Sequence, residues 1–341
     1  MTDFNRLRTG LVAASVLLLC LVLAPAQPAF AAVYAPPKGK IWHGVTAGEE
    51  VRDFTARTGK APAVWQTFVR WGAFYEHAFA RARSAQARVM LHVSTSEGQG
   101  SPGVISPGQI ARGGGDSYLL ELNRRIAEHG RPVYIRFMGE MNNCNNAYAA
   151  YDCNGRRRSA DFSAVRFKQA WRRSHLIVRG GDVATLNARL RRMRLAPVRT
   201  GETSLPRAPV AFMWAPMTGG SPMISALAPQ VYWPGRRYVD WVGTSFYSRF
   251  PNFHYLEPYY QRFAVKQRKP FAFAEWAMWG SDNLDFARRL FGWINTHPRV
   301  KMLQYNQGAL PSGPFRLRHY PRSARVIAGA LGSFRFAGRT P

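Results

Sequence analysis

The chain has 341 residues, of which 46% are hydrophobic and 13% aromatic. This composition excludes an intrinsically disordered chain and a coiled coil, and it indicates a substantial packed core. Lys and Arg number 47 against 19 Asp and Glu, a formal net charge of +28 at pH 7. Such a charge suits an anionic partner or surface, but by itself it names neither.

The N-terminal segment has the pattern of a secretory signal peptide. Arg6 and Arg8 precede an apolar run over 11–24, which small residues follow up to Ala31. The run is too short for a membrane-spanning helix, and cleavage is expected near Ala31. We therefore predict a signal peptide over 1–31 and a secreted protein, extracellular or periplasmic.

After a predicted linker at 32–39, short apolar runs alternate with helical patterns through a single domain, 40–341. The expected strands are 41–45, 63–68, 88–93, 133–138, 210–215, 241–246, 271–274 and 301–304. The expected helices are 49–58, 74–84, 118–129, 162–179, 256–269, 284–296 and 323–331. The Gly- and Pro-rich connection 217–240 shows no helical pattern.

Eight nearly continuous apolar strands separated by helices are typical of a parallel sheet covered on both faces. An open doubly wound sheet has the same alternation of elements. However, no glycine-rich phosphate loop follows the first strand, and eight units suit closure. We predict the α/β class and a single (β/α)8 TIM barrel.

Two carboxylates end predicted strands, Glu140 after the fourth and Glu275 after the seventh. The carboxyl ends of the strands carry the active site in this fold, so the two side chains could face each other. A protonated acid opposite an ionised nucleophile breaks a glycosidic bond with retention at a separation of about 5–5.5 Å, against about 6.5–9.5 Å for inversion. The alternative is that the glutamates form structural ion pairs, for example with Arg136.

Four stretches resemble retaining barrel glycoside hydrolases, most closely glycoside hydrolase family 26, known mainly for β-mannanases. They are IRFMGEMNN, FKQAWRRSHLIVR, YWPGRRYVDWVGTSFY and KPFAFAEWAMWG. The resemblance implies that Glu140 is the acid/base, that Glu275 is the nucleophile, and that Tyr247 supports the nucleophile. The family usually has His immediately before its acid/base Glu, whereas Gly139 stands here, and His92 could supply the missing polar contact.

Further candidates lie at or near predicted strand ends. Amide, guanidinium and aromatic groups there could bind sugar hydroxyls or stack on pyranose rings. The substrate-binding candidates are His92, Arg136, Asn142, Trp71, Trp214, Trp276, Trp279 and Tyr305. A tryptophan at any one of these positions is also a common core residue.

Cys144 and Cys153 flank a polar loop that follows Glu140. In an oxidising compartment they should form a disulfide, and two free thiols are the alternative. The sequence has no HExxH, CxxC or calcium-loop motif, so we expect no metal and no cofactor.

Together these features predict a secreted hydrolase that cleaves internal bonds of a β-linked polysaccharide by double displacement. The net charge adds an acidic glycan to the possible substrates and an anionic cell wall to the possible surfaces. The chain has no recognised nucleic-acid module, so no specific nucleic-acid partner is expected. The alternatives are a catalytically impaired carbohydrate-binding barrel and a polyanion-binding wall protein.

Overall fold

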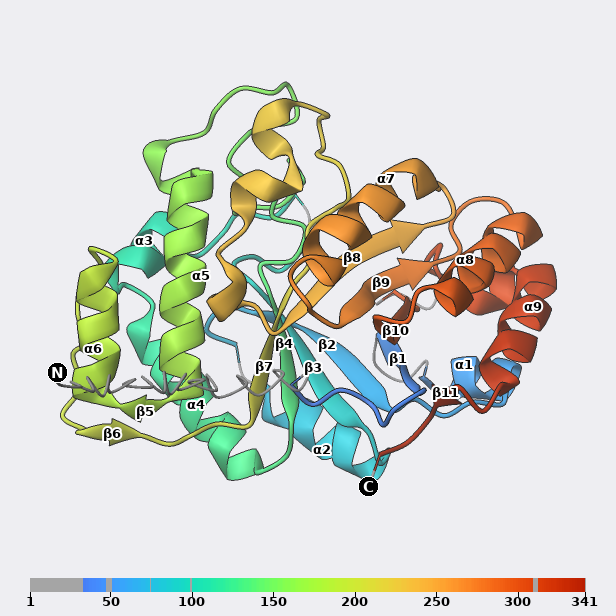
Figure 1. Cartoon of the computed structure of the whole chain (residues 1–341), viewed down its shortest axis with the longest axis horizontal. Helices are drawn as coiled ribbons and strands as arrows, with labels where there is room; N and C mark the ends of the chain where they lie inside the picture. The colour runs from blue at the N-terminus through green and yellow to red at the C-terminus, as the bar shows by residue number, and fades with distance from the viewer. Residues whose placement is uncertain (1–32, 47–50, 74, 99, 309–311, 341) are drawn as a thin grey trace, which may run out of the picture. The chain divides into compact units, whose positions relative to one another are not determined.

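A computed structural model describes most of the chain, namely residues 33–46, 51–73, 75–98, 100–308 and 312–340. The predicted signal peptide, 1–31, lies outside the described residues. Figure 1 shows strands in the middle of the molecule with helices around their outside.

Eight parallel strands form one closed sheet in the order in which they occur along the chain. They are β1 (Ile41–Thr46), β2 (Val64–Arg70), β3 (Arg88–Ser94), β4 (Val133–Phe137), β7 (Val210–Trp214), β8 (Trp241–Tyr247), β9 (Phe271–Ala277) and β10 (Val300–Asn306). Because β1 pairs with both β2 and β10, the sheet has no free edge. The predicted (β/α)8 barrel is confirmed, and all eight strands fall where they were expected.

Helices connect the strands on the outside of the barrel. They are α1 (Val51–Thr58), α2 (Glu76–Ser84), α3 (Pro107–Arg112), α4 (Asp116–His129), α5 (Ala164–Arg179), α6 (Val183–Arg192), α7 (Phe253–Tyr259), α8 (Leu284–Thr296) and α9 (Pro321–Gly332). A π-helical segment, 260–265, continues α7, and short 3-10 turns fill 217–240. Three two-residue strands, β5 (Gly181–Asp182), β6 (Ser204–Leu205) and β11 (Phe336–Ala337), lie outside the closed set.

Two of these helices, α3 and α6, were not predicted. Helix α3 has six residues, too few for a periodic signal, and depends on a capping box between Ser106 and Gln109. Helix α6 begins at Asp182, whose carboxylate accepts a bond from the Thr185 N–H at 2.7 Å. No helix was predicted there, although the buried Val183, Leu186 and Leu190 recur at helical spacing.

The segment predicted as a linker is packed against the amino end of the barrel. The carbonyl of Tyr34 accepts hydrogen bonds from the Tyr134 hydroxyl at 2.6 Å and from the Arg88 guanidinium at 2.7 Å. The Trp241 indole donates to the Val33 carbonyl at 2.7 Å. Residues 33–35 therefore close this end of the barrel instead of hanging free.

Strand alternation divides the core into two layers. Odd and even residues of a strand face opposite sides, so one set packs under the helices and the other fills the barrel. The set that fills the amino half is apolar and includes Trp42, Val64, Met90, Tyr134, Met213, Trp241, Ala272 and Met302. The inward positions at the carboxyl ends carry polar groups instead, and these form the candidate site.

Candidate active site

Glu140 sits in a tight turn just beyond β4. Both Met138 and Glu140 have positive φ, 43° and 53°, which costs a non-glycine residue about 1–3 kcal/mol. Backbone bonds hold the turn, because the Met138 N–H donates to the Val93 carbonyl and the Glu140 N–H to the Ala215 carbonyl, each at 2.8 Å. The two neighbouring strands thus fix where the Glu140 side chain leaves the barrel.

Gly139, the departure from the family pattern, has a steric reason. A Cβ atom at this position would lie 2.6 Å from Nε of Arg136 and 3.0 Å from its Cζ. Any side chain there would displace the arginine, which is fully buried. The glycine and the arginine side chain therefore depend on each other.

Glu275 reaches the interior through an irregularity in the sheet. The register between β8 and β9 shifts between Thr244 and Ser245, which places Ser245 opposite Glu275. The shift lets Ala274 and Glu275 both avoid the helix layer, whereas strict alternation would turn one of them outward. As a result Trp276 packs in the outer layer and Glu275 faces the barrel mouth.

Three donors surround the Glu275 carboxylate. Its Oε1 accepts from the Tyr247 hydroxyl and from Asn306 Nδ2, the latter at 3.1 Å, while its Oε2 accepts from Arg136 Nη1. Asn306 also donates to the Tyr247 oxygen at 3.1 Å. Burial and the charge of Glu275 raise the pKa of Tyr247 well above its ordinary value. The phenol therefore stays protonated and remains a donor to Glu275.

Arg136 joins the two glutamates. Its Nη1 pairs with Glu275, its Nη2 lies 3.6 Å from Glu140 Oε1, and Nη2 also donates to Ser245 Oγ at 2.7 Å. Because both carboxylates contact one guanidinium, the two side chains meet at the same place at the barrel mouth. Burial alone would lower the pKa of Arg136, but the charges of Glu275 and Glu140 outweigh it and raise that pKa.

The two glutamates are slightly exposed, whereas the arginine that contacts both is not. The side chains of Glu140 and Glu275 are 12% and 10% exposed, whereas that of Arg136 is 0% exposed. A ligand can therefore contact the two carboxylates, whereas Arg136 is buried and contacts the carboxylates instead. The ion pairs weighed as the alternative in the sequence do exist, and they bring both glutamates to one place.

His92 and Phe68 continue the site along β3 and β2. In register, Phe68 lies opposite His92 and His92 opposite Arg136. Burial and the charge of Arg136 hold the pKa of His92 well below 6.5. Because its Nδ1 lies 3.2 Å from Arg136 Nη1, which can only donate, the neutral ring carries its proton on Nε2. Phe68, a residue that sequence reasoning missed, is 45% exposed and lies 5.0 Å from the His92 ring.

The two asparagines that follow Glu140 differ in role, since Asn142 supports the backbone and Asn143 contacts Glu140. Asn142 is fully buried and its Nδ2 donates to three backbone carbonyls, including that of Gly219 at 2.6 Å. Its next neighbour Asn143 instead donates to Glu140 Oε2 at 3.0 Å. This arrangement lends no support to sugar binding by Asn142. The residue that contacts Glu140 is Asn143, which was not among the predicted site residues.

Most of the predicted aromatic contacts lie in the core. Trp71 is 8% exposed, Trp276 is 1% exposed, and Trp214 and Tyr305 are 0% exposed. All four belong to the layer under the helices, so a sugar-binding role at these positions finds no support in the structure.

Trp279 is the predicted aromatic that keeps a partly exposed side chain. Its ring lies 5.7 Å from that of Tyr247 and 5.5 Å from that of Phe250, which is 52% exposed. Trp279 and Phe250 therefore form an aromatic rim beside Tyr247, which itself contacts Glu275.

The predicted Cys144–Cys153 disulfide is confirmed, with Cα atoms 5.0 Å apart. The Cys144 N–H also donates to the Ser221 carbonyl at 2.8 Å, which ties this loop to the connection after β7. The disulfide thus holds the loop that starts with Asn143, beside Glu140.

The described residues contain no group of three or more His, Cys, Asp or Glu side chains placed to hold a metal ion. None of their helices is long and apolar enough to cross a bilayer.

Comparison with known proteins supports the fold. No protein-family model matches the sequence, and neither does any curated protein. Among solved structures, GH26A from Muricauda sp. is similar with a TM-score of 0.56 and 16% identity over 89% of this chain and 92% of that one. A GH26 β-mannanase from Bacteroides ovatus has a TM-score of 0.56 and 16% identity, over 88% and 91% of the two chains. The YdhT protein from Bacillus subtilis has a TM-score of 0.56 and 12% identity, over 90% and 87%. The barrel is therefore similar to that of family 26 glycoside hydrolases, as the motifs indicated.

Proposed function

We propose that the protein is a secreted retaining glycoside hydrolase that cleaves internal bonds of a β-linked polysaccharide. The observation that carries this proposal is the contact of Glu140 and Glu275 with the single guanidinium of Arg136 at the mouth of the barrel. The likeness to GH26 mannanases supports the class of reaction. The Cys144–Cys153 disulfide supports an oxidising compartment.

The surroundings of the two carboxylates differ in a way that suits two roles. Glu275 accepts from Arg136, Tyr247 and Asn306, and an ionised carboxylate can accept from all three. Glu140 accepts one hydrogen bond, from Asn143 on Oε2, and its Oε1 lies 3.6 Å from Arg136 Nη2, so Glu140 is held by fewer donors than Glu275. We assign Glu275 as nucleophile and Glu140 as acid and base.

The reaction then has two displacements. In the first, a Glu275 oxygen bonds to the anomeric carbon, the bond to the leaving oxygen breaks, and Glu140 gives its proton to that oxygen. In the second, Glu140 takes a proton from water, the water oxygen bonds to the anomeric carbon, and Glu275 is released. The Tyr247 hydroxyl holds the orientation of Glu275 through both steps.

The rim places exposed aromatic surface on two sides of the pair. Phe68 lies beyond His92 on the side of β2, and Trp279 with Phe250 lies beside Tyr247 on the side of β8 and β9. Sugar rings present C–H groups that pack on such faces. These aromatic residues are assigned to bind sugar units on either side of the cleaved bond.

A panel of polysaccharides tests the proposal. The purified protein is incubated with β-mannan, β-xylan, mixed-linkage β-glucan and uronate-containing glycans, and released oligosaccharides are measured. Glu140→Gln and Glu275→Gln should each lower the rate at least about a thousandfold, as removal of a reacting group does. Glu128→Gln, at an exposed site on α4, is the matched control and should keep the full rate.

The remaining outcomes would overturn the proposal in distinct ways. Binding of a glycan without any product would identify a carbohydrate-binding barrel that does not catalyse. Binding that ignores sugar identity and vanishes at moderate salt would identify a polyanion-binding protein. Full activity in either glutamine variant would remove the assigned roles.

A further inference from the structure

Arg249 lies in a tight turn at the mouth of the barrel, immediately after β8. The Phe250 N–H closes the turn by donating to the Tyr247 carbonyl at 3.0 Å. Ser248 fixes the turn to the loop after β9, because its Oγ accepts from the Trp279 N–H at 2.7 Å and donates to the Trp279 carbonyl at 3.1 Å. Figure 1 shows β8 and β9 side by side and pointing the same way. These contacts hold Arg249 next to the aromatic rim.

The guanidinium of Arg249 rests on the two rings of that rim. Its Cζ lies 5.0 Å from the centre of the Trp279 ring and 5.8 Å from that of the Phe250 ring. A guanidinium that stacks on aromatic rings uses its face, so the N–H donors at its edge stay available. Arg249 is exposed, and its side chain forms no ion pair or hydrogen bond with another described residue. Its donors can therefore bind a ligand at the rim.

An acidic sugar at this mouth needs a cation that is not already neutralised. The ionised Glu275 would repel a further carboxylate on the substrate. Arg136 cannot bind that carboxylate, because it is 0% exposed and already contacts both glutamates. At the end of β2, on the other side of the mouth, Arg70 is paired with Glu97. The exposed guanidinium beside the β8 and β9 rim is therefore the one in a position to serve.

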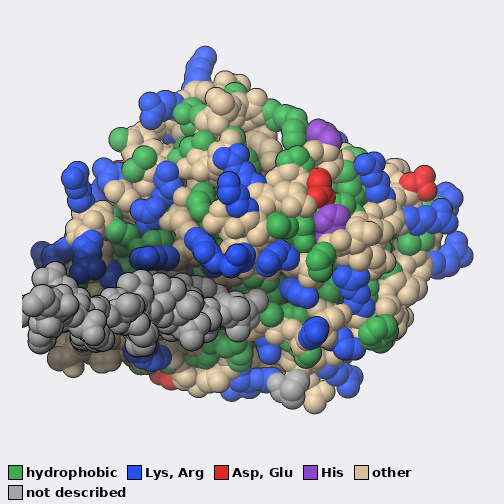
Figure 2. Space-filling view, in the orientation of Figure 1, with side chains coloured by type: hydrophobic (Ala, Val, Ile, Leu, Met, Phe, Trp, Pro, Cys, Tyr) green, Lys and Arg blue, Asp and Glu red, His purple; other side chains and the backbone are tan. Residues whose placement is uncertain are grey.

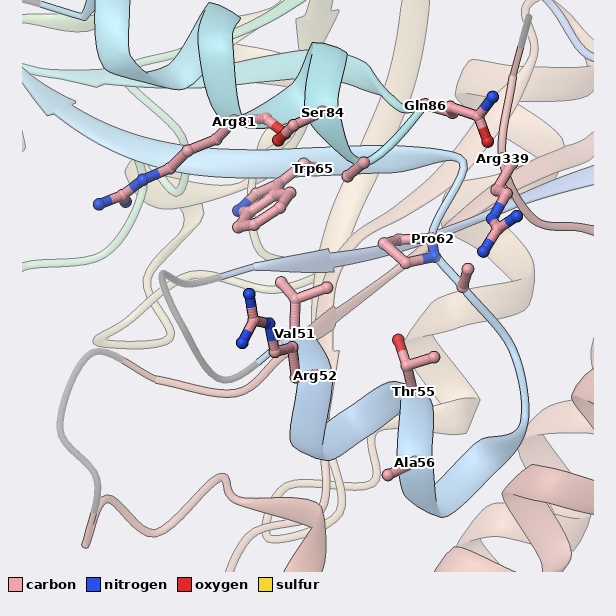
Figure 3. A pocket seen from close by; sticks show the side chains of 12 residues that line it. Val51, Arg52, Thr55, Ala56, Pro62, Trp65, Arg81, Ser84, Gln86 and Arg339 are labelled. Carbon is pink, nitrogen blue, oxygen red and sulfur yellow. The ribbon is translucent and has the colours of Figure 1, made fainter.

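Arginines far from the mouth cannot select between sugars at the cleaved bond. The net charge is +28, and Figure 2 shows Lys and Arg side chains spread widely over one face. A field of this sign attracts any polyanion, and salt screens it. A cavity of about 1040 Å³ between α1 and α2 is lined in part by Arg52 and Arg81, as Figure 3 shows, and it shares no residue with the glutamate site. Selection at the cleaved bond thus depends on an arginine at the mouth.

We propose that Arg249 binds the carboxylate of a uronate unit at the Trp279–Phe250 rim, so that the site prefers a β-linked acidic polysaccharide to its neutral counterpart. A guanidinium can form two parallel hydrogen bonds with a planar carboxylate, but not with the hydroxymethyl group of a neutral sugar. The Trp279 ring offers an apolar surface to the C–H groups of the sugar. The inference rests on the proposed function for its role in hydrolysis, although the binding itself can be measured without cleavage.

Equilibrium binding of matched oligosaccharides tests this preference. β-Linked mannuronate and mannose chains of equal length differ only in the carboxylate that replaces each hydroxymethyl group, and glucuronate and glucose chains form a second pair. Binding is measured with Glu275→Gln, so that no chain is cleaved. At least one acidic chain should bind at least about tenfold more tightly than its neutral partner.

Two substitutions that each remove one positive charge separate Arg249 from the general field. Arg249→Gln, added to Glu275→Gln, should lower the preference for the acidic chain at least about tenfold. Arg191→Gln, on an exposed face of α6, removes the same charge and should change that preference less than about twofold. Arg249→Lys keeps the charge without the fork and should give an intermediate preference. Circular dichroism checks that each variant is folded.

Three results would overturn the inference. They are no preference for either acidic chain, equal losses of preference in Arg249→Gln and Arg191→Gln, and equally tight binding of a sulfated mannose chain through Arg249. Hydrolysis by the unaltered protein separates this inference from the proposed function. Cleavage of a neutral chain with no acidic preference would contradict the inference alone. Acidic preference that depends on Arg249, without cleavage of any chain, would contradict the proposed catalysis alone.

Discussion

At the amino end of the barrel the inward positions of β3, β4 and β10 carry Met90, Tyr134 and Met302, whereas two residues later the same strands carry His92, Arg136 and Gln304. Both sets are buried. The first fills space with side chains that need few polar partners, while the second contains a charge that must be matched. One strand can therefore serve stability at its amino end and chemistry at its carboxyl end.

The largest effect should come from removing the shared charge. Arg136→Met leaves two carboxylates facing each other without their counter-ion, so we expect the free energy of unfolding to fall by about 3–5 kcal/mol. Denaturant unfolding at pH 7 measures it. Arg191→Met, on an exposed face of α6, is the control and should change stability by less than about 0.5 kcal/mol. A loss below about 1 kcal/mol for Arg136→Met would mean that the ion pairs do not organise this end of the barrel.

Truncation at the other end should affect stability alone. Met90→Ala creates a cavity in the apolar amino half, and we expect it to cost about 2–5 kcal/mol. Its folded molecules should keep the turnover number of the unaltered protein on the substrate that the glycan panel identifies. A turnover number reduced tenfold or more in the folded variant would show that the two ends are not independent.

Buried histidines of the outer layer should make the fold sensitive to acid. Burial lowers the pKa of His43 and of His175 to about 3. The unfolded chain gains these protons near pH 6.5 and the folded chain does not, so stability present above pH 6.5 is lost as the pH falls toward 3. The loss is about 1.4 kcal/mol per pH unit for each histidine.

Unfolding measured between pH 7 and pH 4.5 tests this, with His175→Gln as the variant. The variant should show a shallower fall in stability than the unaltered protein. An identical slope would mean that His175 is protonated in the folded state.

The smallest effect concerns the loop beside Glu140. Asn143→Ala removes one hydrogen bond to its carboxylate, and we expect the rate to fall by about tenfold. Because Asn143 acts through Glu140, the basic limb of the pH–rate profile should also move, a change that mere loosening of the fold would not produce. Asn154→Ala, at an exposed position of the same loop, is the control. An unchanged pH profile would exclude a positioning role for Asn143.

Periodicity was sufficient to predict the barrel and to find both glutamates, because apolar runs and strand-end carboxylates are local features. It could not predict the register shift at Thr244–Ser245, which turns Glu275 inward and Trp276 outward. The shift arises from pairing between strands and leaves no mark in the strand itself. Tyr305 was predicted from its position at a strand end, whereas alternation from the inward Met302 places Asn306, and not Tyr305, toward Glu275.

The meeting of Arg136, Gly139 and Glu275 also lay beyond sequence reasoning. Gly139 appeared as a missing polar contact, and the structure shows it as the space that the Arg136 side chain requires. A contact between residues 139 positions apart depends on the closed sheet. The exposure of Phe68 also depends on the closed sheet, because this residue of β2 lies at the mouth of the barrel.

The central claim is that Glu140 and Glu275 act on one sugar by double displacement. Proton NMR of the first product released from a β-linked substrate tests it most directly. The account predicts that the β-anomer appears first and then mutarotates to the equilibrium mixture, because two inversions restore the configuration. Initial appearance of the α-anomer would contradict it, since a single displacement by water would then have occurred.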